Sequence, residues 1–202
     1  MVTRQRARLV AAAAIAGTVS AFATAATAAA DEPVEAGITV PVVEGLSADF
    51  MNGVDASSIL SLEESGVTFR DFDGEEADVF EVFADAGVNY SRIRVWNDPY
   101  DADGNGYGGG TVDAERATEI GLRSTAAGMR VFVDFHYSDF WAHPGQQPLP
   151  KAWEGMTTAE RADAMYDYTV DTLSRMDDAG VDVGMVQIGN ENSGLLLAET
   201  AW

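Results

Sequence analysis

The feature that most constrains the fold is a segment pattern that occurs three times. Each time, a stretch with helical spacing ends in Ala-Gly, and a β-rich run follows directly: AGVNY at 86–90, AGMRV at 127–131 and AGVDV at 179–183. A glycine just past the last helical residue is a common helix stop. Helices that alternate with strands in this way indicate a parallel sheet covered by helices.

The boundaries of these elements follow from the same pattern. The expected strands are Phe50–Val54, Val88–Trp96, Met129–His136 and Val181–Gly189, and the expected helices are Ala77–Ala86, Asp113–Ala127 and Thr157–Ala179. The long loops, 97–112 and 137–156, both follow strands. Loops enlarged on that side favour an α/β fold of the (β/α)8 TIM-barrel type, whose functional face lies there. A doubly wound sheet is the alternative, but no glycine-rich phosphate loop follows the first strand.

The first 30 residues form a separate segment. Arg4, Arg6 and Arg8 precede an apolar stretch that is rich in alanine, and Ala28–Ala30 is a small-residue cleavage site before Asp31. This order predicts a secretory signal peptide over 1–30 and therefore a secreted, extracellular protein, with an N-terminal membrane anchor as the alternative. We expect no membrane association after cleavage.

The remainder divides into two parts. Residues 31–46, which contain proline and glutamate, are expected to be a flexible lead-in. Residues 47–202 are expected to be the N-terminal half of a barrel, because a complete (β/α)8 barrel needs about 250 residues. About the first four βα units would then be present.

Composition excludes several classes of function. The formal net charge of −21 argues against nucleic acid and against anionic membranes as partners, because both attract basic surfaces. The absence of cysteine excludes disulfides, thiol catalysis and cysteine metal sites. With Lys151 as the single lysine, most Schiff-base schemes are also excluded.

Side chains of one parity are polar in each expected strand. Successive strand residues point to opposite faces, so this set shares one face of the sheet: Asp55, Arg92, Arg94, Asp134, His136 and Gln187. The simplest placement points the set into the barrel and towards its upper mouth. Buried arginines need partners, and Asp55, Asp134 and Glu191 are candidates. We expect a structural role for Arg92 and a functional role for Arg94 and His136, which lie nearer the strand tips.

The fourth strand breaks off into Gly189-Asn190-Glu191. A carboxyl group at such a tip can protonate a departing glycosidic oxygen and then activate water, so Glu191 is the candidate catalytic acid/base. Asn190 beside it can bind a substrate hydroxyl. No other residue in 1–202 is an obvious nucleophile, because Asp55 and Asp134 serve equally well as ion-pair partners.

Aromatic residues lie in the loops that follow the strands. Trp96 and Trp141 are expected to stack on sugar rings, whereas loop packing is the favoured interpretation for Tyr100 and Trp153. The segment DADGNG at 101–106 imitates the start of a calcium-binding loop, but Val112 stands where a bidentate glutamate belongs, so a tight turn is favoured. His136 and His143 are not spaced as zinc ligands, and no metal site is expected.

On these residues the chain resembles the family 53 glycoside hydrolases, the arabinogalactan endo-β-1,4-galactanases. The segments that carry the resemblance are long: RVWNDPYDADGNGYGGG at 94–110, FHYSDFWA at 135–142 and MVQIGNENSG at 185–194. The resemblance extends over nearly all of the chain from about residue 47. It implies a (β/α)8 barrel, secretion, and hydrolysis of β-1,4-galactan (type I arabinogalactan) with retention of configuration.

The resemblance also assigns roles to residues. It implies that Glu191 is the acid/base and that Arg94, His136 and Asn190 hold the first sugar. The full set of expected substrate-binding residues is Asp55, Arg94, Trp96, Asn97, His136, Asp139, Trp141 and Asn190. The family nucleophile, a glutamate at the tip of strand seven, would lie beyond Trp202, as would a calcium site, so no cofactor is expected in 1–202. We therefore expect the chain to be truncated and inactive alone, and a monomer when full length.

Two alternatives remain open. One is a related retaining barrel glycosidase that acts on another plant polysaccharide, such as mannan or xylan. The other is a half-barrel that binds galactan without cleaving it.

Overall fold

A computed structural model describes residues 37, 41, 43–47, 49–193 and 195–200 of the chain. Two compact units are distinguished, residues 1–45 and residues 46–202. The predicted signal peptide and most of the predicted lead-in lie outside the described residues, so both remain predictions. In the described part of the first unit, residues 44 and 45 form a turn. No described helix is both long enough and apolar enough to cross a membrane.

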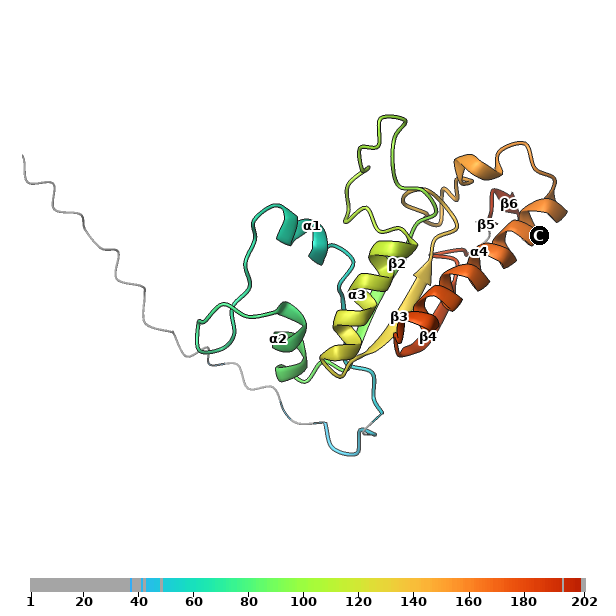
Figure 1. The fold of residues 1–202 in the computed structure, drawn as a ribbon. Helices are drawn as coiled ribbons and strands as arrows, with labels where there is room; N and C mark the ends of the chain where they lie inside the picture. The colour runs from blue at the N-terminus through green and yellow to red at the C-terminus, as the bar shows by residue number, and fades with distance from the viewer. Residues whose placement is uncertain (1–36, 38–40, 42, 48, 194, 201–202) are drawn as a thin grey trace, which may run out of the picture. The chain divides into compact units, whose positions relative to one another are not determined.

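The second unit is built on a four-stranded parallel sheet (Figure 1). The strands are β1 (Gly53–Asp55), β2 (Tyr90–Val95), β3 (Arg130–Phe135) and β4 (Val183–Ile188), and they lie side by side in sequence order. Helices connect them. This order is that of successive units of a (β/α)8 barrel, whereas a doubly wound sheet reverses direction at a switch point. The predicted fold class is therefore confirmed.

Each of the three predicted helices precedes a strand. They are α2 (Val79–Asp85), α3 (Ala114–Ala126) and α4 (Thr158–Ala179), all close to the expected bounds. Local capping explains the agreement. Thr157 and Glu160 form a reciprocal capping box at the start of α4. At its end, Gly180 has a φ of 92°, a left-handed conformation that favours glycine, and Gly87 and Gly128 after the other two helices do the same.

The first strand differs from the prediction. The apolar run Phe50–Val54 was expected to be the strand, but only Gly53–Asp55 pairs, in register with Tyr90–Arg92. Phe50 is 55% exposed. Pairing with β2, rather than local apolarity, therefore decides where β1 begins.

Several short elements were not predicted. They are α1 (Ile59–Glu64), a 3₁₀ turn (Lys151–Trp153) and a hairpin of β5 (Leu195–Leu196) and β6 (Glu199–Thr200). Each is too short to show a hydrophobic period in the sequence.

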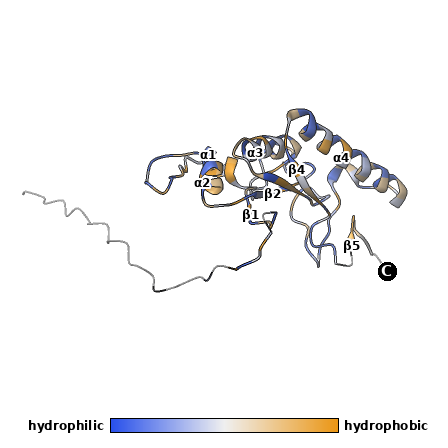
Figure 2. Cartoon of the chain, turned by 90° about the horizontal axis from the view of Figure 1, so that it is seen from below, coloured by the Kyte–Doolittle hydropathy of each residue, from blue (hydrophilic) through white to orange (hydrophobic). Residues whose placement is uncertain are grey.

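The core lies between the sheet and helices α3 and α4. Alternate residues of β2 and β3 are fully buried there: Ile93, Val95, Val131, Val133 and Phe135. They pack with Ala117 and Ile120 of α3 and with Met176 of α4. Figure 2 shows hydrophobic and hydrophilic residues mixed along α4, as in an amphipathic helix that packs one face against a core. The predicted parity of β2 and β3 is confirmed.

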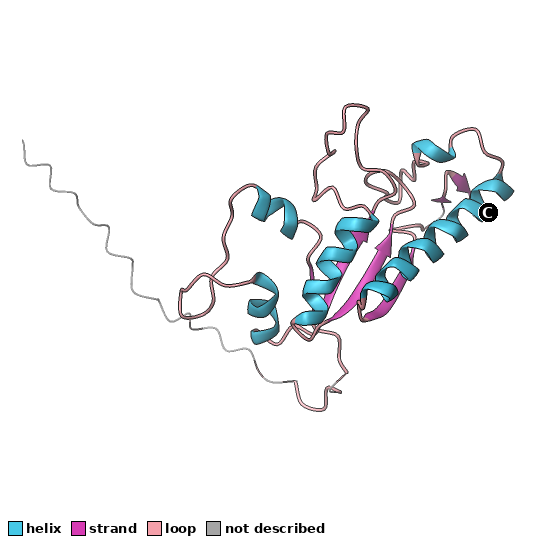
Figure 3. Ribbon diagram, in the orientation of Figure 1, coloured by secondary structure: helices cyan, strands magenta, loops and turns pink. Residues whose placement is uncertain are grey.

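Two long loops leave the carboxyl ends of β2 and β3 (Figure 3). They are cross-linked, since the Asn97 N–H donates to the Ser138 carbonyl at 2.9 Å. The Lys151 ammonium reinforces this link by donating to the carbonyls of Asp98 and Tyr100, at 3.0 and 2.5 Å. The single lysine of the chain thus holds the two loops together beside the strand tips.

Candidate active site

An ion-pair network centred on Arg92 occupies the polar face of the sheet. The guanidinium donates to Asp55 on β1 at 2.6 Å and to Asp134 on β3. It also donates to Asn190, beyond the end of β4, at 3.1 Å. Arg92 therefore joins side chains from three neighbouring segments, in agreement with the structural role predicted for it. The two aspartates lie nearer to Arg92 than to Arg94.

Asp55 is held as an anion between two arginines. Its second oxygen accepts the Ser57 N–H at 3.0 Å, and Arg94 Nε lies 3.8 Å from the oxygen that pairs with Arg92. Burial alone would raise the pKa of Asp55. The hydrogen bonds from Ser57 and the charges of Arg94 and Arg92 outweigh that effect and hold the pKa below its usual value. Asp55 is therefore suited to organise positive charge rather than to donate a proton.

Arg94 lies against an aromatic surface. Its Cζ atom is 4.3 Å from the ring centre of Trp141 and 5.5 Å from that of Trp96. The side chain is only 9% exposed, and this burial lowers the pKa of Arg94. Within the described residues, its buried Nε atom has no hydrogen-bond partner. Trp141 is 42% exposed. Its indole therefore contacts the Arg94 guanidinium and is also accessible to solvent.

Trp96 and His136 form a buried layer beneath Trp141. The Trp96 Nε1–H donates to His136 Nδ1 at 3.0 Å, and the Ala142 N–H donates to the same nitrogen at 3.2 Å. Because Nδ1 accepts both bonds, the ring proton lies on Nε2, which faces Asp134 at 3.4 Å. Both side chains are fully buried. They support the loops here, and direct contact of Trp96 or His136 with substrate stays a prediction.

Asp139 and Asn97, the two remaining loop residues, differ in whether their side-chain oxygens have hydrogen-bond partners. Asp139 accepts the backbone N–H groups of Asp98 at 3.0 Å and of Lys151 at 2.7 Å. Burial raises the pKa of its carboxyl, while these bonds act in the opposite direction. By contrast, Asn97 has a buried Oδ1 atom without a partner in the described part of the chain. The Asn97 acceptor is therefore unpaired but shielded from solvent, whereas the oxygens of Asp139 are used within the loops.

Asn190 and Glu191 end the polar face at the tip of β4. The Asn190 side chain is buried, donates to the Ala142 carbonyl at 2.7 Å and accepts from Arg92. Glu191 is exposed and has a φ of 48°, which is rare for a residue with a side chain. The fixed amide thus directly precedes a carboxyl group that is open to solvent.

Three residues of this region were not among the site residues expected from the sequence. Ser57 orients Asp55 and accepts the Arg94 N–H at 2.9 Å through its hydroxyl oxygen. Ser57 lies two residues after Asp55, which is the spacing of an Asx turn, so the sequence could have indicated this contact. Gln147 and Lys151 act through backbone carbonyls of distant segments, and no sequence pattern reveals such contacts.

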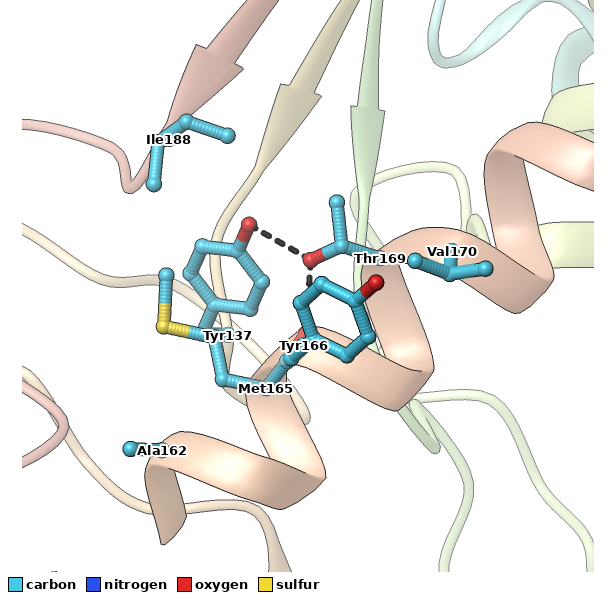
Figure 4. A pocket seen from close by; sticks show the side chains of 7 residues that line it. All are labelled: Tyr137, Ala162, Met165, Tyr166, Thr169, Val170 and Ile188. Atoms are coloured by element: carbon cyan, nitrogen blue, oxygen red, sulfur yellow. Dashed lines mark hydrogen bonds between the residues drawn. The ribbon is translucent and has the colours of Figure 1, made fainter. Parts of the chain in front are cut away.

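The structure has pockets on both faces of the sheet. Figure 4 shows one of about 300 Å³ between α4 and the end of β4, lined by Tyr137, Ala162, Met165, Tyr166, Thr169, Val170 and Ile188. It contains none of the predicted site residues. Another, of about 270 Å³, is lined in part by Asp55 and Arg92. Of the predicted site residues, Asp55 is the one that lines this second pocket.

The DADGNG segment folds into a tight turn. Asp101 accepts the backbone N–H groups of Asp103 and Asn105 at 2.9 and 2.8 Å. Within the described ranges, no group of three or more histidine or acidic side chains has the geometry to hold a metal ion.

Comparison with known proteins agrees with the resemblance seen in the sequence. The model of glycosyl hydrolase family 53 matches residues 51–202. An endo-beta-1,4-galactanase of Bacillus subtilis is 52% identical over 163 residues, which cover 81% of this chain and 38% of that protein. An arabinogalactan endo-beta-1,4-galactanase of Cellvibrio japonicus is 40% identical over 152 residues, or 74% of this chain and 38% of that protein.

Solved structures agree with these relatives. The family 53 catalytic domain of Ignisphaera aggregans superposes with a TM-score of 0.77 at 42% identity, over 81% of this chain and 46% of that one. One of two fungal beta-1,4-galactanases gives 0.66 at 36% identity, over 73% of this chain and 42% of that one. The chain thus spans about two fifths of the length of these curated relatives, since its matching residues cover 38% of each. On sequence and fold together, the chain belongs to glycosyl hydrolase family 53.

Proposed function

We propose that this chain is part of a secreted, endo-acting hydrolase of β-1,4-galactan, the backbone of type I arabinogalactan. Family membership supports the reaction class. The names of the Bacillus and Cellvibrio relatives, an endo-beta-1,4-galactanase and an arabinogalactan endo-beta-1,4-galactanase, support the substrate. The observation that carries the proposal is the exposed Glu191 carboxyl, held at the tip of β4 next to the buried Asn190.

In this proposal Glu191 acts first as an acid. Its carboxyl proton passes to the glycosidic oxygen as the bond to the sugar breaks, which leaves a neutral hydroxyl on the departing chain. Glu191 then acts as a base and takes a proton from the water that attacks the sugar. Retention of configuration needs a second carboxylate about 5–5.5 Å away as nucleophile. We expect that nucleophile to be a glutamate outside residues 1–202.

The same surface offers groups that suit a neutral sugar polymer. Trp141 presents an exposed ring above Arg94, and ring faces stack on the C–H surfaces of sugars. Asn97 has an Oδ1 atom that is buried and unpaired among the described residues, so a shift of its side chain would let it accept a hydroxyl group. These residues would contact substrate beside Glu191, whereas Asp55 and Arg92 would hold the floor of the site.

The experiment that tests the proposal uses the natural gene product that contains this sequence. Incubation with β-1,4-galactan is expected to release short galacto-oligosaccharides. Proton NMR of the first product formed is expected to show the β-anomer, and the α-anomer would exclude retention. Galactan that is bound but not cut would point to a binding protein, and cleavage of mannan or xylan instead would reassign the substrate.

Secretion is proposed from the first 30 residues. Protein recovered from the culture medium is expected to begin at Asp31 when its N-terminus is sequenced. Protein retained in the membrane with residues 1–30 attached would support the anchor instead.

A further inference from the structure

The peptide bond between Asn190 and Glu191 is held by a residue of another loop. Gln147, in the loop that follows β3, is only 5% exposed. Its Nε2 atom donates to the Asn190 carbonyl oxygen at 2.8 Å and to the His143 carbonyl oxygen at 3.2 Å. Both amide hydrogens of Gln147 therefore serve backbone carbonyls, and one of these carbonyls belongs to the peptide that leads into Glu191.

The backbone at Glu191 needs such a restraint. A φ of 48° lies in the left-handed region, where a residue with a side chain is strained. Such conformations persist only when the surroundings determine them, and they cluster at functional sites. Rotation of the Asn190–Glu191 peptide would change this φ and would swing the carboxyl group away from its present direction.

Two other contacts fix the preceding side chain but not this peptide. Asn190 donates to the Ala142 carbonyl at 2.7 Å and accepts from Arg92 at 3.1 Å, both through its amide group. These bonds hold the Cβ–Cγ end of Asn190. The Gln147 bond acts on the main-chain carbonyl, which is the part that sets the orientation of Glu191.

We propose that Gln147 is a positioning residue that aims the Glu191 carboxyl at the substrate by holding the Asn190 carbonyl. This inference rests on the proposed acid/base role of Glu191. A donor is required at this position because the two partners are both carbonyl oxygens. A glutamate would fit the space, but its ionised form would repel both carbonyls, and its protonated form could donate to only one.

The test compares Gln147→Met and Gln147→Glu in the natural gene product with galactan as substrate. We expect kcat to fall about 10- to 100-fold in both variants, as for a catalytic group displaced by about 1 Å, with KM changed less than about twofold. Gln147→Glu is expected to recover part of the loss as the pH is lowered, because its carboxylic acid regains one donor. Gln147→Met has no such group and is expected to show no recovery.

A matched control is available one residue away. Gln146 is exposed, and Gln146→Glu introduces the same charge without touching the Asn190 carbonyl. This variant is expected to keep the kcat and the pH profile of the parent. Parent-like kcat in Gln147→Met, or equal losses in Gln146→Glu and Gln147→Glu, would overturn the positioning role.

A second readout does not depend on activity. The Ser193 N–H donates to the Glu191 carbonyl at 2.9 Å, so its hydrogen exchange reports on the backbone around Glu191. Exchange at Ser193 is expected to be faster in Gln147→Met and unchanged in Gln146→Glu. If the parent itself cleaves no galactan, the proposed function fails while this measurement still decides the positioning role. Unchanged exchange in Gln147→Met would contradict it.

Discussion

Arg92 and Asn190 are 98 residues apart in the sequence, yet the guanidinium of one donates to the side-chain oxygen of the other at 3.1 Å. The strand β3 separates them in the sheet, and the same guanidinium pairs with its Asp134. The bond therefore ties the residue before the candidate acid/base to an ion pair in the middle of the sheet. Local stability and the geometry of the proposed site depend on the same arginine.

Replacement of Arg92 by methionine is expected to destabilise the fold. Asp134 is fully buried, so the change leaves an uncompensated carboxylate inside the protein. Breaking such a pair costs about 3–5 kcal/mol, and the partial exposure of Arg92 places the expected loss near about 3 kcal/mol. Urea unfolding of the natural gene product measures it.

Arg130 provides the matched control for this variant. It lies on β3 and pairs with Asp182, but both side chains are about half exposed, at 50% and 52%. Exposed pairs contribute little, so Arg130→Met is expected to change the free energy of unfolding by less than about 1 kcal/mol. Equal losses in the two variants would show that the Arg92 network does not stabilise the fold more than an exposed ion pair does.

Replacement of Glu191 by glutamine is expected to lower the turnover of galactan by a factor of about 10²–10⁴. The amide keeps the shape of the side chain but cannot donate the proton that the leaving oxygen needs. Galactan binding, measured by affinity electrophoresis, should stay close to that of the parent. Glu119→Gln, at an exposed position of α3, is the control and should behave as the parent does. Parent-like turnover in Glu191→Gln would remove this residue from the acid/base role.

Trp141 and Trp153 are expected to give opposite phenotypes on replacement by alanine. Trp141 is 42% exposed and stacks on Arg94, so its loss should raise KM for galactan about tenfold, equivalent to about 1.4 kcal/mol, with little loss of stability. Trp153 is 6% exposed and packs in the core, so its loss should cost about 3–5 kcal/mol of folding free energy. Steady-state kinetics and urea unfolding separate the two effects.

An unchanged KM in Trp141→Ala would mean that the exposed ring does not contact the polymer. A marginal stability change in Trp153→Ala would mean that the packing around the 3₁₀ turn contributes little.

Features set by neighbours in the sequence could be predicted, and features set by distant partners could not. The start of α4 was predictable because the side chains of Thr157 and Glu160 each accept a hydrogen bond from the other's backbone N–H, within one turn of the chain. The start of β1 was not, because Phe50 is as apolar as a strand residue and only the partner strand decides pairing. The same limit explains why α1, with only Ile59 and Leu60 buried, went unnoticed.

The candidate site follows the same rule. Alternation along β2 and β3 places Arg92, Arg94 and Asp134 on one face, and the structure confirms this parity. Which arginine pairs with Asp134 depends on how far each side chain reaches across the sheet. The alternation of residues along a strand gives no information on that reach. The contact of Gln147 with the Asn190 carbonyl depends on how one long loop folds back over a strand tip. Nothing local in the sequence determines that path.

The stability of the loop after β2 is expected to depend on alkaline pH through Tyr100. The Tyr100 hydroxyl donates to Asp113 at 2.9 Å, and burial together with this bond raises the pKa of Tyr100 to about 12. A folded-state pKa above the unfolded value of about 10 stabilises the fold fully below pH 10. That contribution is lost as the pH rises through about 12.

Tyr100→Phe should therefore be less stable than the parent by about 1–2 kcal/mol at pH 8, and this difference should shrink between pH 10 and 12. Urea unfolding across that range measures it, with Tyr166→Phe on the exposed side of α4 as the control. A difference that stays constant up to pH 12 would show that the Asp113 bond does not control the titration of Tyr100.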